Sequence, residues 1–253
     1  MRIKITLTGL RNKVFKRDHF YQLSGLIYSM LGNSNPEFSS WLHNNGYKNG
    51  NKSFKFFNFS RLLTKGRNHE YLGENKDLIL FKDRKAYFYV SSPVKEFLNS
   101  LIDFLLAENT IKLGDHILEV ENALAMPSRN LSKEVMFKSI TPVVVSKSTV
   151  EYDTPFYIRA YQEPAEFDEY ITRNAKEKWK IFSGEENGNI LLTSDKSYIK
   201  RKGRRTACKI ELTSNQLLFG SIVPIKAEGD PSIISFLYDT GLGEKNSQGM
   251  GMV

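Results

Sequence analysis

The sequence has a single cysteine, only four histidines and no long apolar run. Cys208 has no partner for a disulfide within the chain and cannot build a thiolate zinc cluster. The histidines lie far apart, with neither HxxxH nor HxH spacing, so neither a metal ion nor another cofactor is predicted. These residues are His19, His43, His69 and His116. No apolar stretch reaches the ~18 residues of a membrane span, and the N-terminus alternates like a strand instead of resembling a signal peptide. We therefore expect a cytoplasmic protein with no membrane partner.

The 253 residues are enough for one large domain or two small ones. Hydrophobic residues make up 40% and charged residues 25%, close to the globular average, which excludes wholesale disorder, collagen-like repeats and a coiled coil. The chain carries 36 Lys and Arg against 28 Asp and Glu, a net charge of +8. This basic balance favours a polyanionic partner, although many basic proteins never bind nucleic acid.

Hydrophobic periodicity predicts the order of elements in the first half. Alternation of apolar and polar residues indicates a strand at about 2–9. Asp18 is placed to cap a helix that ends near Gly32, and Pro36 opens a second, short helix. The remaining expected elements are an aromatic strand at 52–60, a polar connection at 61–77, strands at 78–83 and 85–92, a helix at 93–107 and an extended segment at 111–126.

This order matches the βαββαβ unit of the ferredoxin-like fold. The second half repeats it, with a strand at 137–145, a helix toward Trp179, a long Gly- and Lys-rich stretch, two strands and a short helix after Asp230. We therefore expect an α+β protein of two tandem ferredoxin-like, RRM-like βαββαβ domains, at 1–127 and 128–253. No self-similarity of sequence supports a duplication, so this expectation rests on element order alone.

The tail GLGEKNSQGMGMV places four glycines after a predicted helix. They are Gly241, Gly243, Gly249 and Gly251. Glycine allows a positive φ or a close approach of the backbone to a bulky partner. A Rossmann fingerprint is excluded because that loop follows a strand, and a Walker loop is excluded because Lys245 lacks the required neighbours. A flexible tail is the alternative.

This tail resembles the glycine-rich signature of the RAMP proteins, and QLSGLIYSML followed by NPEFSSWLH resembles the N-terminal region of the CRISPR-associated protein 6 family. That family consists of endoribonucleases that cut precursor CRISPR RNA within each repeat. The resemblance implies two RRM-like domains facing one another, metal-independent cleavage, and products with a 2′,3′-cyclic phosphate and a 5′-hydroxyl. It implies CRISPR repeat RNA as the partner, with subunits of a CRISPR effector complex as further candidates. We expect a monomer or a homodimer.

RNA carries its own nucleophile, the 2′-hydroxyl, so the enzyme must remove that proton, stabilise the phosphate and protonate the leaving oxygen. Histidine suits proton exchange near neutral pH. By resemblance, Tyr28, His43 and Lys52 are the acid, the base and the phosphate-stabilising group. Lys48 and Lys55 are alternatives to Lys52, because the loop after His43 is longer and richer in lysine than the resemblance leads us to expect. A helix cap, core packing and an exposed strand face are the ordinary alternatives for the three residues.

A second group of basic residues favours phosphate contacts, because charges of one sign this dense repel one another unless a polyanion offsets them. Gly203 is the expected turn of a basic hairpin, and a solvated loop is the alternative. The residues expected to bind RNA here are Lys196, Lys200, Arg201, Lys202, Arg204 and Arg205. We also expect the four glycines of the tail to let the backbone lie against RNA. Alanine at Gly243 or Gly249 should then weaken RNA binding with little change in stability. If these glycines instead adopt positive φ, alanine should also cost ~1 kcal/mol or more of stability.

Two other functions stay open at this point. A non-cleaving RAMP subunit that holds guide RNA in an effector complex would need the same fold and the same glycine-rich loop. An enzyme acting on a small molecule could use the same scaffold, because the fold does not determine the function.

Overall fold

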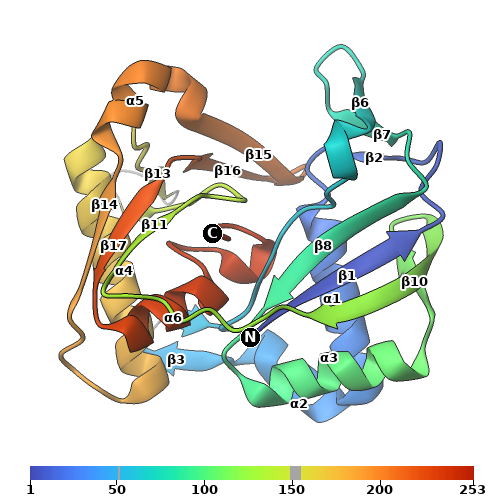
Figure 1. Cartoon of the computed structure of the whole chain (residues 1–253), viewed down its shortest axis with the longest axis horizontal. Coiled ribbons are helices and arrows are strands. Elements are labelled where there is room, and N and C mark those ends of the chain that lie inside the picture. The colour runs from blue at the N-terminus through green and yellow to red at the C-terminus, as the bar shows by residue number, and fades with distance from the viewer. Residues whose placement is uncertain (51, 149–154) are drawn as a thin grey trace.

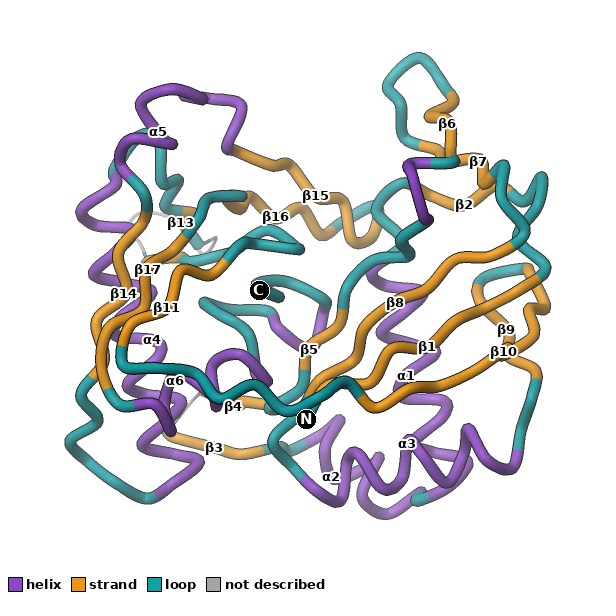
Figure 2. The backbone as a smooth tube through the Cα atoms, in the orientation of Figure 1, coloured by secondary structure: helices purple, strands orange, loops and turns teal. Residues whose placement is uncertain are grey.

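The computed structural model describes residues 1–50, 52–148 and 155–253. Two halves, each built from antiparallel strands and helices, lie side by side, and the end of the chain lies between them (Figure 1). The backbone trace shows the last loop in the middle of the molecule (Figure 2). Within the described residues, no helix combines the length and the apolar character needed to cross a membrane.

The first half contains a five-stranded antiparallel sheet in the order β5-β8-β1-β10-β9. Its strands are β1 (Arg2–Thr8), β5 (Asn58–Phe59), β8 (Lys85–Ser91), β9 (Thr110–Leu113) and β10 (His116–Ala125). Helices α1 (Phe20–Ser34) and α3 (Lys95–Ala107) cover one face, where Ile3, Ile5 and Leu7 of β1 are buried. The order β10-β1-β8-β5 is that of the βαββαβ unit, as the sequence predicts.

The second half repeats this plan around a smaller sheet in the order β11-β17-β14. Its main elements are β11 (Glu134–Phe137), α4 (Pro164–Ser183), β14 (Ile190–Ser194), β17 (Ile225–Gly229) and α6 (Pro231–Thr240). Two smaller pairs accompany them, β12 (Ser146–Lys147) with β13 (Phe156–Tyr157) and β15 (Ala207–Thr213) with β16 (Gln216–Ser221). The hairpin of β15 and β16 lies between β14 and β17 in the sequence and extends toward the first half (Figure 1).

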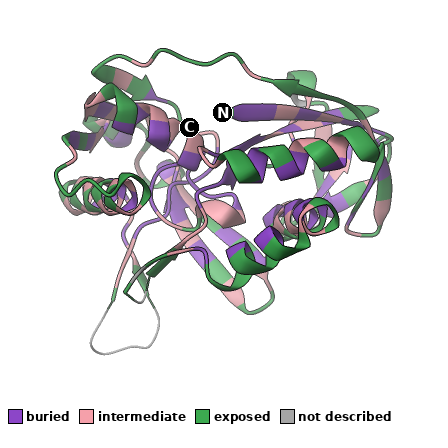
Figure 3. Cartoon of the chain, turned by 90° about the horizontal axis from the view of Figure 1, so that it is seen from below, coloured by how far each residue is buried: buried purple, intermediate pink, exposed green. Residues whose placement is uncertain are grey.

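The start of α1 differs from the prediction. Asp18 does not cap the helix, because its carboxylate accepts hydrogen bonds from Arg17 and from the Glu211 N–H of β15. The helix instead begins at Phe20 without a side-chain cap. The next helix, α2 (Pro36–Asn44), begins at its proline as expected. The helices bury one stripe and expose the opposite face (Figure 3).

The aromatic strand expected at 52–60 is divided between two sheets. β4 (Lys52–Phe54) pairs with β3 (Tyr47–Asn49), whereas β5 pairs with β8 of the large sheet. Between them Phe56 is buried and has a φ of +48°, a backbone conformation that residues other than glycine rarely adopt. The buried aromatic ring thus marks the point where the chain leaves one sheet for the other.

The prediction of a polar connection at 61–77 was wrong. After the short 3-10 helix η1 (Lys65–Arg67), this segment forms β6 (His69–Leu72), which pairs with β7 (Leu78–Phe81), and β7 also pairs with β2 (Val14–Lys16). The Gly- and Lys-rich stretch of the second half likewise contains β14. β2 and β6 are short and carry polar residues, so they lack the extended alternation that reveals a strand in a sequence.

His19 lies just before α1 and is only 2% exposed. Its Nε2 accepts from the Leu62 N–H at 2.9 Å, which leaves the ring hydrogen on Nδ1, where it is donated to the Lys16 carbonyl at 3.0 Å. Burial lowers the pKa of this imidazole to about 4, below its ordinary 6.5. A proton added at Nε2 would face the Leu62 N–H and break this hydrogen bond.

We expect the stability of the protein to fall as the pH drops from 6.5 toward 4, because the unfolded chain takes up a proton at His19 that the folded protein resists. Above pH 6.5 the full contribution, roughly 3 kcal/mol, is present. Urea unfolding at pH 7.5 and at pH 4.5 measures the loss, which should be smaller in His19→Gln than in the wild type. His116→Gln is the matched control and should behave like the wild type. An equal loss in His19→Gln would contradict this role of His19.

Candidate active site and RNA interface

Tyr28 and His43 come together where α1 packs against α2. Their ring centroids lie 5.1 Å apart with an interplanar angle of 81°, and the Tyr28 ring also packs edge-on against Phe57 at 5.7 Å. The Ser39 hydroxyl donates to the Tyr28 carbonyl at 3.3 Å, which joins the two helices at this level. His43 is exposed, whereas Tyr28 is partly buried. The structure thus brings together two of the residues that the sequence predicts to be catalytic.

Tyr28 and His43 differ in where they carry a hydrogen. Burial raises the pKa of Tyr28 to about 12, so the phenol stays protonated at neutral pH. His43 Nδ1 lies 3.2 Å from Asn44 Oδ1, and Asn44 Nδ2 donates to the Ser40 hydroxyl, which assigns Oδ1 as the acceptor. The ring hydrogen of His43 is therefore on Nδ1, and Nε2 keeps its lone pair. In this arrangement the Tyr28 hydroxyl can donate a proton, and His43 Nε2 can accept one.

The turn after α2 determines which lysine contacts the histidine. Gly46 has a φ of +61°, and a Cβ atom there would lie 2.6 Å from the Phe54 carbonyl oxygen. Only glycine permits this close approach of the turn to the end of β4. As a result Lys55 Nζ donates to the His43 carbonyl oxygen at 2.9 Å. Lys55, one of the two predicted alternatives, is the lysine that contacts His43.

The other two candidate lysines make different contacts. Lys52 Nζ forms an ion pair of 2.7 Å with Glu177 of α4, which crosses from the first half to the second. Lys48 Nζ donates to Asn45 Oδ1 at 3.0 Å. The structure therefore does not place Lys52 against His43. An exposed ion pair contributes only ~0–1 kcal/mol, so Lys52 is still free to turn toward an RNA phosphate.

The second group of basic residues forms a helix. The prediction of a hairpin turn at Gly203 was therefore wrong. Asp195 caps α5 (Lys196–Lys202) by accepting from the Tyr198 N–H at 2.8 Å. Gly203, with a φ of +53°, ends this helix and begins the 3-10 helix η2 (Gly203–Thr206). The exposed cations of this surface, the basic cluster, are Lys200, Arg201, Lys202, Arg204 and Arg205.

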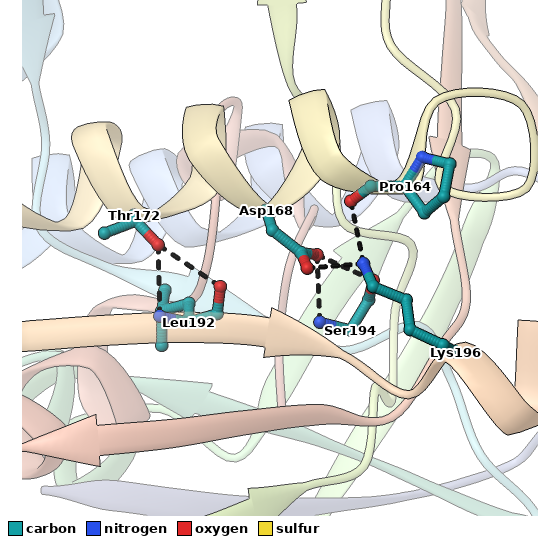
Figure 4. A network of polar contacts seen from close by, with 6 residues as sticks. All are labelled: Pro164, Asp168, Thr172, Leu192, Ser194 and Lys196. Carbon is teal, nitrogen blue, oxygen red and sulfur yellow. Dashed lines mark hydrogen bonds and ion pairs between the residues drawn. The ribbon is translucent and has the colours of Figure 1, made fainter.

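The Lys196 side chain is half exposed, and its ammonium group contacts α4 and the end of β14 (Figure 4). Its ammonium group donates to the Pro164 carbonyl at 2.9 Å, to the Ser194 hydroxyl at 3.0 Å and to the Asp168 carboxylate. Asp168 of α4 also accepts from the Ser194 N–H at 2.9 Å, and Thr172 bonds the backbone of Leu192 one turn later on α4. These contacts attach the start of α5 to α4 and thereby orient the basic cluster, and they occupy the Lys196 ammonium group.

The glycine-rich loop, residues 241–251, is packed between the two halves and includes the 3-10 helix η3 (Asn246–Gln248). From the first half, the Ser24 hydroxyl donates to the Ser247 carbonyl and Asn58 Nδ2 donates to the Met250 carbonyl, both at 3.0 Å. The four glycines of the predicted motif are buried and have positive φ, and a Cβ atom on any of them would meet a protein atom at 2.5 Å or less. They are Gly241, Gly243, Gly249 and Gly251.

These contacts revise the expected effect of alanine in the loop. A Cβ atom at Gly243 would lie 2.3 Å from the Val144 carbonyl oxygen, and one at Gly249 would lie 2.5 Å from the Phe20 ring. Both glycines have positive φ, so the expectation of little change in stability was wrong, and the alternative of a loss of stability applies. Sequence alone indicates that glycine is required but not that the close neighbour is the protein itself.

Lys178 of α4 holds the loop from the second half, and sequence reasoning missed it. Its buried ammonium group donates to the carbonyl oxygens of Gly241 at 2.9 Å and Gly243 at 2.6 Å, and to Asn246 Oδ1 at 2.6 Å. Burial lowers the pKa of Lys178 to about 7, and the three oxygens together accept all three ammonium hydrogens. In the sequence, Lys178 could have been noticed because it lies seven residues after Ile171, on the apolar stripe of the helix.

Two family models together match most of the chain. "CRISPR-associated protein Cas6, N-terminal" matches residues 15–123, and "CRISPR associated protein Cas6, C-terminal" matches residues 125–253. The chain belongs to the Cas6 family. Membership confirms the resemblance seen in the glycine-rich tail and in the N-terminal helices, and it covers both halves of the structure.

Relatives within the Cas6 family align along the whole chain. "CRISPR-associated endoribonuclease Cas6 1" of Methanocaldococcus jannaschii is 30% identical over 258 residues, which span 100% of this chain and 92% of that protein. A solved structure described as "CRISPR associated protein Cas6" has a TM-score of 0.73 at 26% identity and covers 100% of this chain and 97% of its own. A second solved structure, described as "An RAMP protein binding different RNA substrates", has a TM-score of 0.78 at 20% identity. The match covers 100% of this chain and 98% of the other, and it supports the fold alone. The predicted α+β class with tandem ferredoxin-like domains is confirmed.

Proposed function

We propose that this member of the Cas6 family is an endoribonuclease that cuts precursor CRISPR RNA within its repeats. The observation that carries the proposal is the contact between Tyr28 and His43, with ring centroids 5.1 Å apart. A protonated phenol beside an imidazole with a free lone pair provides the acid and the base that transfer of an RNA phosphate to its own 2′-oxygen requires. The name of the M. jannaschii relative, an endoribonuclease, supports the same activity.

In the proposed reaction, His43 Nε2 takes the proton of the 2′-hydroxyl, and the 2′-oxygen attacks the adjacent phosphorus. A bond forms between the 2′-oxygen and phosphorus, the bond between phosphorus and the 5′-oxygen breaks, and Tyr28 donates its proton to the leaving oxygen. The products carry a 2′,3′-cyclic phosphate and a 5′-hydroxyl. Every reacting group belongs to the RNA or to this chain, so the proposed reaction is independent of a metal ion.

Lys55 is proposed to stabilise the charge that grows on the phosphate, ahead of Lys52 and Lys48. Its ammonium group is fixed by the hydrogen bond to the His43 carbonyl, so the cation and the imidazole are positioned together. A cation held in place beforehand stabilises the transition state without reorganising during the reaction. Burial, and then the charge of Lys48, lowers the pKa of Lys55.

The basic cluster on α5 and η2 is proposed to bind RNA phosphates away from the cleavage position. Its members are exposed, and α5 is held against α4 by Lys196. The four glycines are proposed to act on RNA indirectly, because their Cα atoms face the protein and fix the shape of the loop.

Alanine at four members of the basic cluster should weaken RNA binding and reduce its dependence on salt. The variant is Lys200→Ala with Arg201→Ala, Arg204→Ala and Arg205→Ala. If all four contact phosphates, the slope of log affinity against log salt should decrease by up to about 3, at ~0.7 per phosphate of a single strand. Fluorescence anisotropy at several KCl concentrations measures the slope. A slope equal to that of the wild type would show that these cations face only solvent.

Incubation of the protein with repeat RNA in EDTA tests the proposed function. A single cut within the repeat, with a 2′,3′-cyclic phosphate on the upstream fragment, is the expected result. Tight, salt-sensitive binding of repeat RNA without any cut would replace the proposal with the non-cleaving RAMP subunit.

A further inference from the structure

A cleft of about 670 Å³ lies between β4, α4 and the glycine-rich loop. Lys55 lines this cleft and also donates to the His43 carbonyl, so the cleft adjoins the candidate active site. Among the residues that the structure describes, six basic residues and two carboxylates line it. A concave surface with this excess of positive charge attracts an anionic ligand. The basic residues are Lys52, Lys55, Lys147, Arg173, Lys178 and Lys245.

Both carboxylates of the cleft already have partners. Glu244 accepts from the Ser146 hydroxyl at 2.8 Å and from the Ser146 N–H at 3.2 Å. Glu177 forms the 2.7 Å ion pair with Lys52, whose side chain is 63% exposed. Because an exposed ion pair contributes little to stability, an RNA phosphate can replace Glu177 as the partner of Lys52.

Arg173 of α4 lines the cleft and makes no ion pair with any carboxylate in the described part of the chain. It is exposed, and its guanidinium carbon lies 4.0 Å from the centre of the Tyr170 ring. The contact with the ring orients the guanidinium group and leaves its N–H groups free to donate. An oriented guanidinium group matches the oxygens of a phosphate, to which it can donate two parallel hydrogen bonds.

Lys245 of the glycine-rich loop is the second such cation, on the opposite wall of the cleft. It is exposed and has a φ of +58°, whereas the other residues of the loop with positive φ are glycines. Its carbonyl accepts from the Gln248 N–H at 2.9 Å and from the Met250 N–H at 3.2 Å, which fixes the backbone here. A charged side chain at a position that favours glycine points to a function for its ammonium group.

We propose that this cleft binds the backbone of the RNA strand next to the cleavage position. Arg173 and Lys245 each contact a phosphate, and a further phosphate replaces Glu177 at Lys52. The inference rests on the proposed function for its substrate class. Contacts to phosphates carry no information about the bases, so the cleft positions the strand without selecting its sequence. Since Lys55 lines the cleft and contacts His43, a strand bound here leads to the candidate active site.

The first test removes one charge from each wall and keeps the side chains long. Arg173→Gln with Lys245→Gln is assayed by fluorescence anisotropy with repeat RNA that carries 2′-O-methyl groups and so cannot be cut by its own 2′-oxygen. Loss of two phosphate contacts should lower the slope of log affinity against log salt by about 1.4, at ~0.7 per phosphate, and weaken binding about tenfold at about 0.1 M KCl. Lys176→Gln with Lys180→Gln removes two exposed cations of α4 that do not line the cleft. This matched control should keep the wild-type slope.

Glu177→Gln tests the exchange at Lys52. Without the carboxylate, Lys52 has no ion pair to break, so the same RNA should bind about threefold more tightly, within the small energy of an exposed ion pair. Glu186→Gln is the matched control, because Glu186 forms another exposed ion pair, 2.6 Å from Lys180 of α4. It should bind RNA like the wild type.

Equal slopes for Arg173→Gln with Lys245→Gln and for its control, or no binding of the RNA by the wild type, would overturn the inference. Binding by Glu177→Gln no tighter than by Glu186→Gln would overturn the exchange at Lys52. Thermal unfolding shows that each variant keeps the fold, and the single variants replace the double one if it fails to fold.

Cleavage of unmodified repeat RNA in EDTA is measured separately, so that the inference and the proposed function can fail independently. Cleavage by the wild type together with equal slopes would overturn only the phosphate contacts of the cleft. A lowered slope without cleavage by the wild type would overturn only the proposed reaction.

Discussion

His43→Ala is expected to slow single-turnover cleavage of repeat RNA by ~10² or more, the usual scale for losing a general base. Binding should change little, because His43 is an exposed residue at the end of α2 and its ring contacts Tyr28 and Asn44. Quench-flow or manual time courses with excess enzyme measure the rate, and anisotropy measures the affinity.

Two variants serve as controls for this result. Tyr28→Phe keeps the ring contacts with His43 and Phe57 but removes the hydroxyl, and it should lose less activity than His43→Ala. His116→Ala removes a histidine of β10 that lies outside the pair and should cleave like the wild type. Cleavage by His43→Ala within threefold of the wild type would remove His43 from the mechanism.

Gly251→Ala is expected to lower the free energy of unfolding by about 3 kcal/mol or more. A Cβ atom at Gly251 would lie 1.9 Å from the Leu242 carbonyl oxygen, and the residue has a φ of +78°. The overlap involves backbone, so it cannot be relieved by rotating a side chain. Strained backbone and steric overlap are among the few mechanisms that produce losses of this size. Urea denaturation of the two proteins measures the difference.

Gly184→Ala separates the two causes. Gly184 ends α4 with the same φ of +78°, but a Cβ atom there would have no heavy atom within 4 Å. This variant should therefore show only the conformational cost, about 1 kcal/mol. Equal losses in the two variants would mean that the packing of the loop against Leu242 adds nothing to stability.

The sequence predicts the order of the large elements because their apolar patterns are long. Six buried apolar residues recur along α1 at helical spacing, and strands such as β1 and β8 alternate clearly. Short strands give too little of such a pattern, so β6, with four residues, and β14, with five, were missed. The break in the aromatic run 52–60 depends on Phe56 entering the core of the second half, a contact that no local pattern encodes.

The candidate site could be predicted only in part, for the same reason. Tyr28 and His43 stand in recognisable segments, but the choice among three lysines depends on the turn at Gly46, which determines where β4 runs. Lys178 could have been noticed as a charge on an apolar stripe. Its three acceptors lie more than sixty residues away in the sequence, so their identity required the folded structure.

The loop between the halves has a consequence for how RNA is bound. Because Ser24 and Asn58 bind it from one side and Lys178 from the other, the relative position of the two halves is already fixed in the free protein. The entropy of bringing the two halves into register is thus lost during folding and not on association with RNA. More of the interaction energy then remains as affinity, which is the general advantage of preorganisation. An RNA that does not fit this fixed surface would have to deform itself to bind.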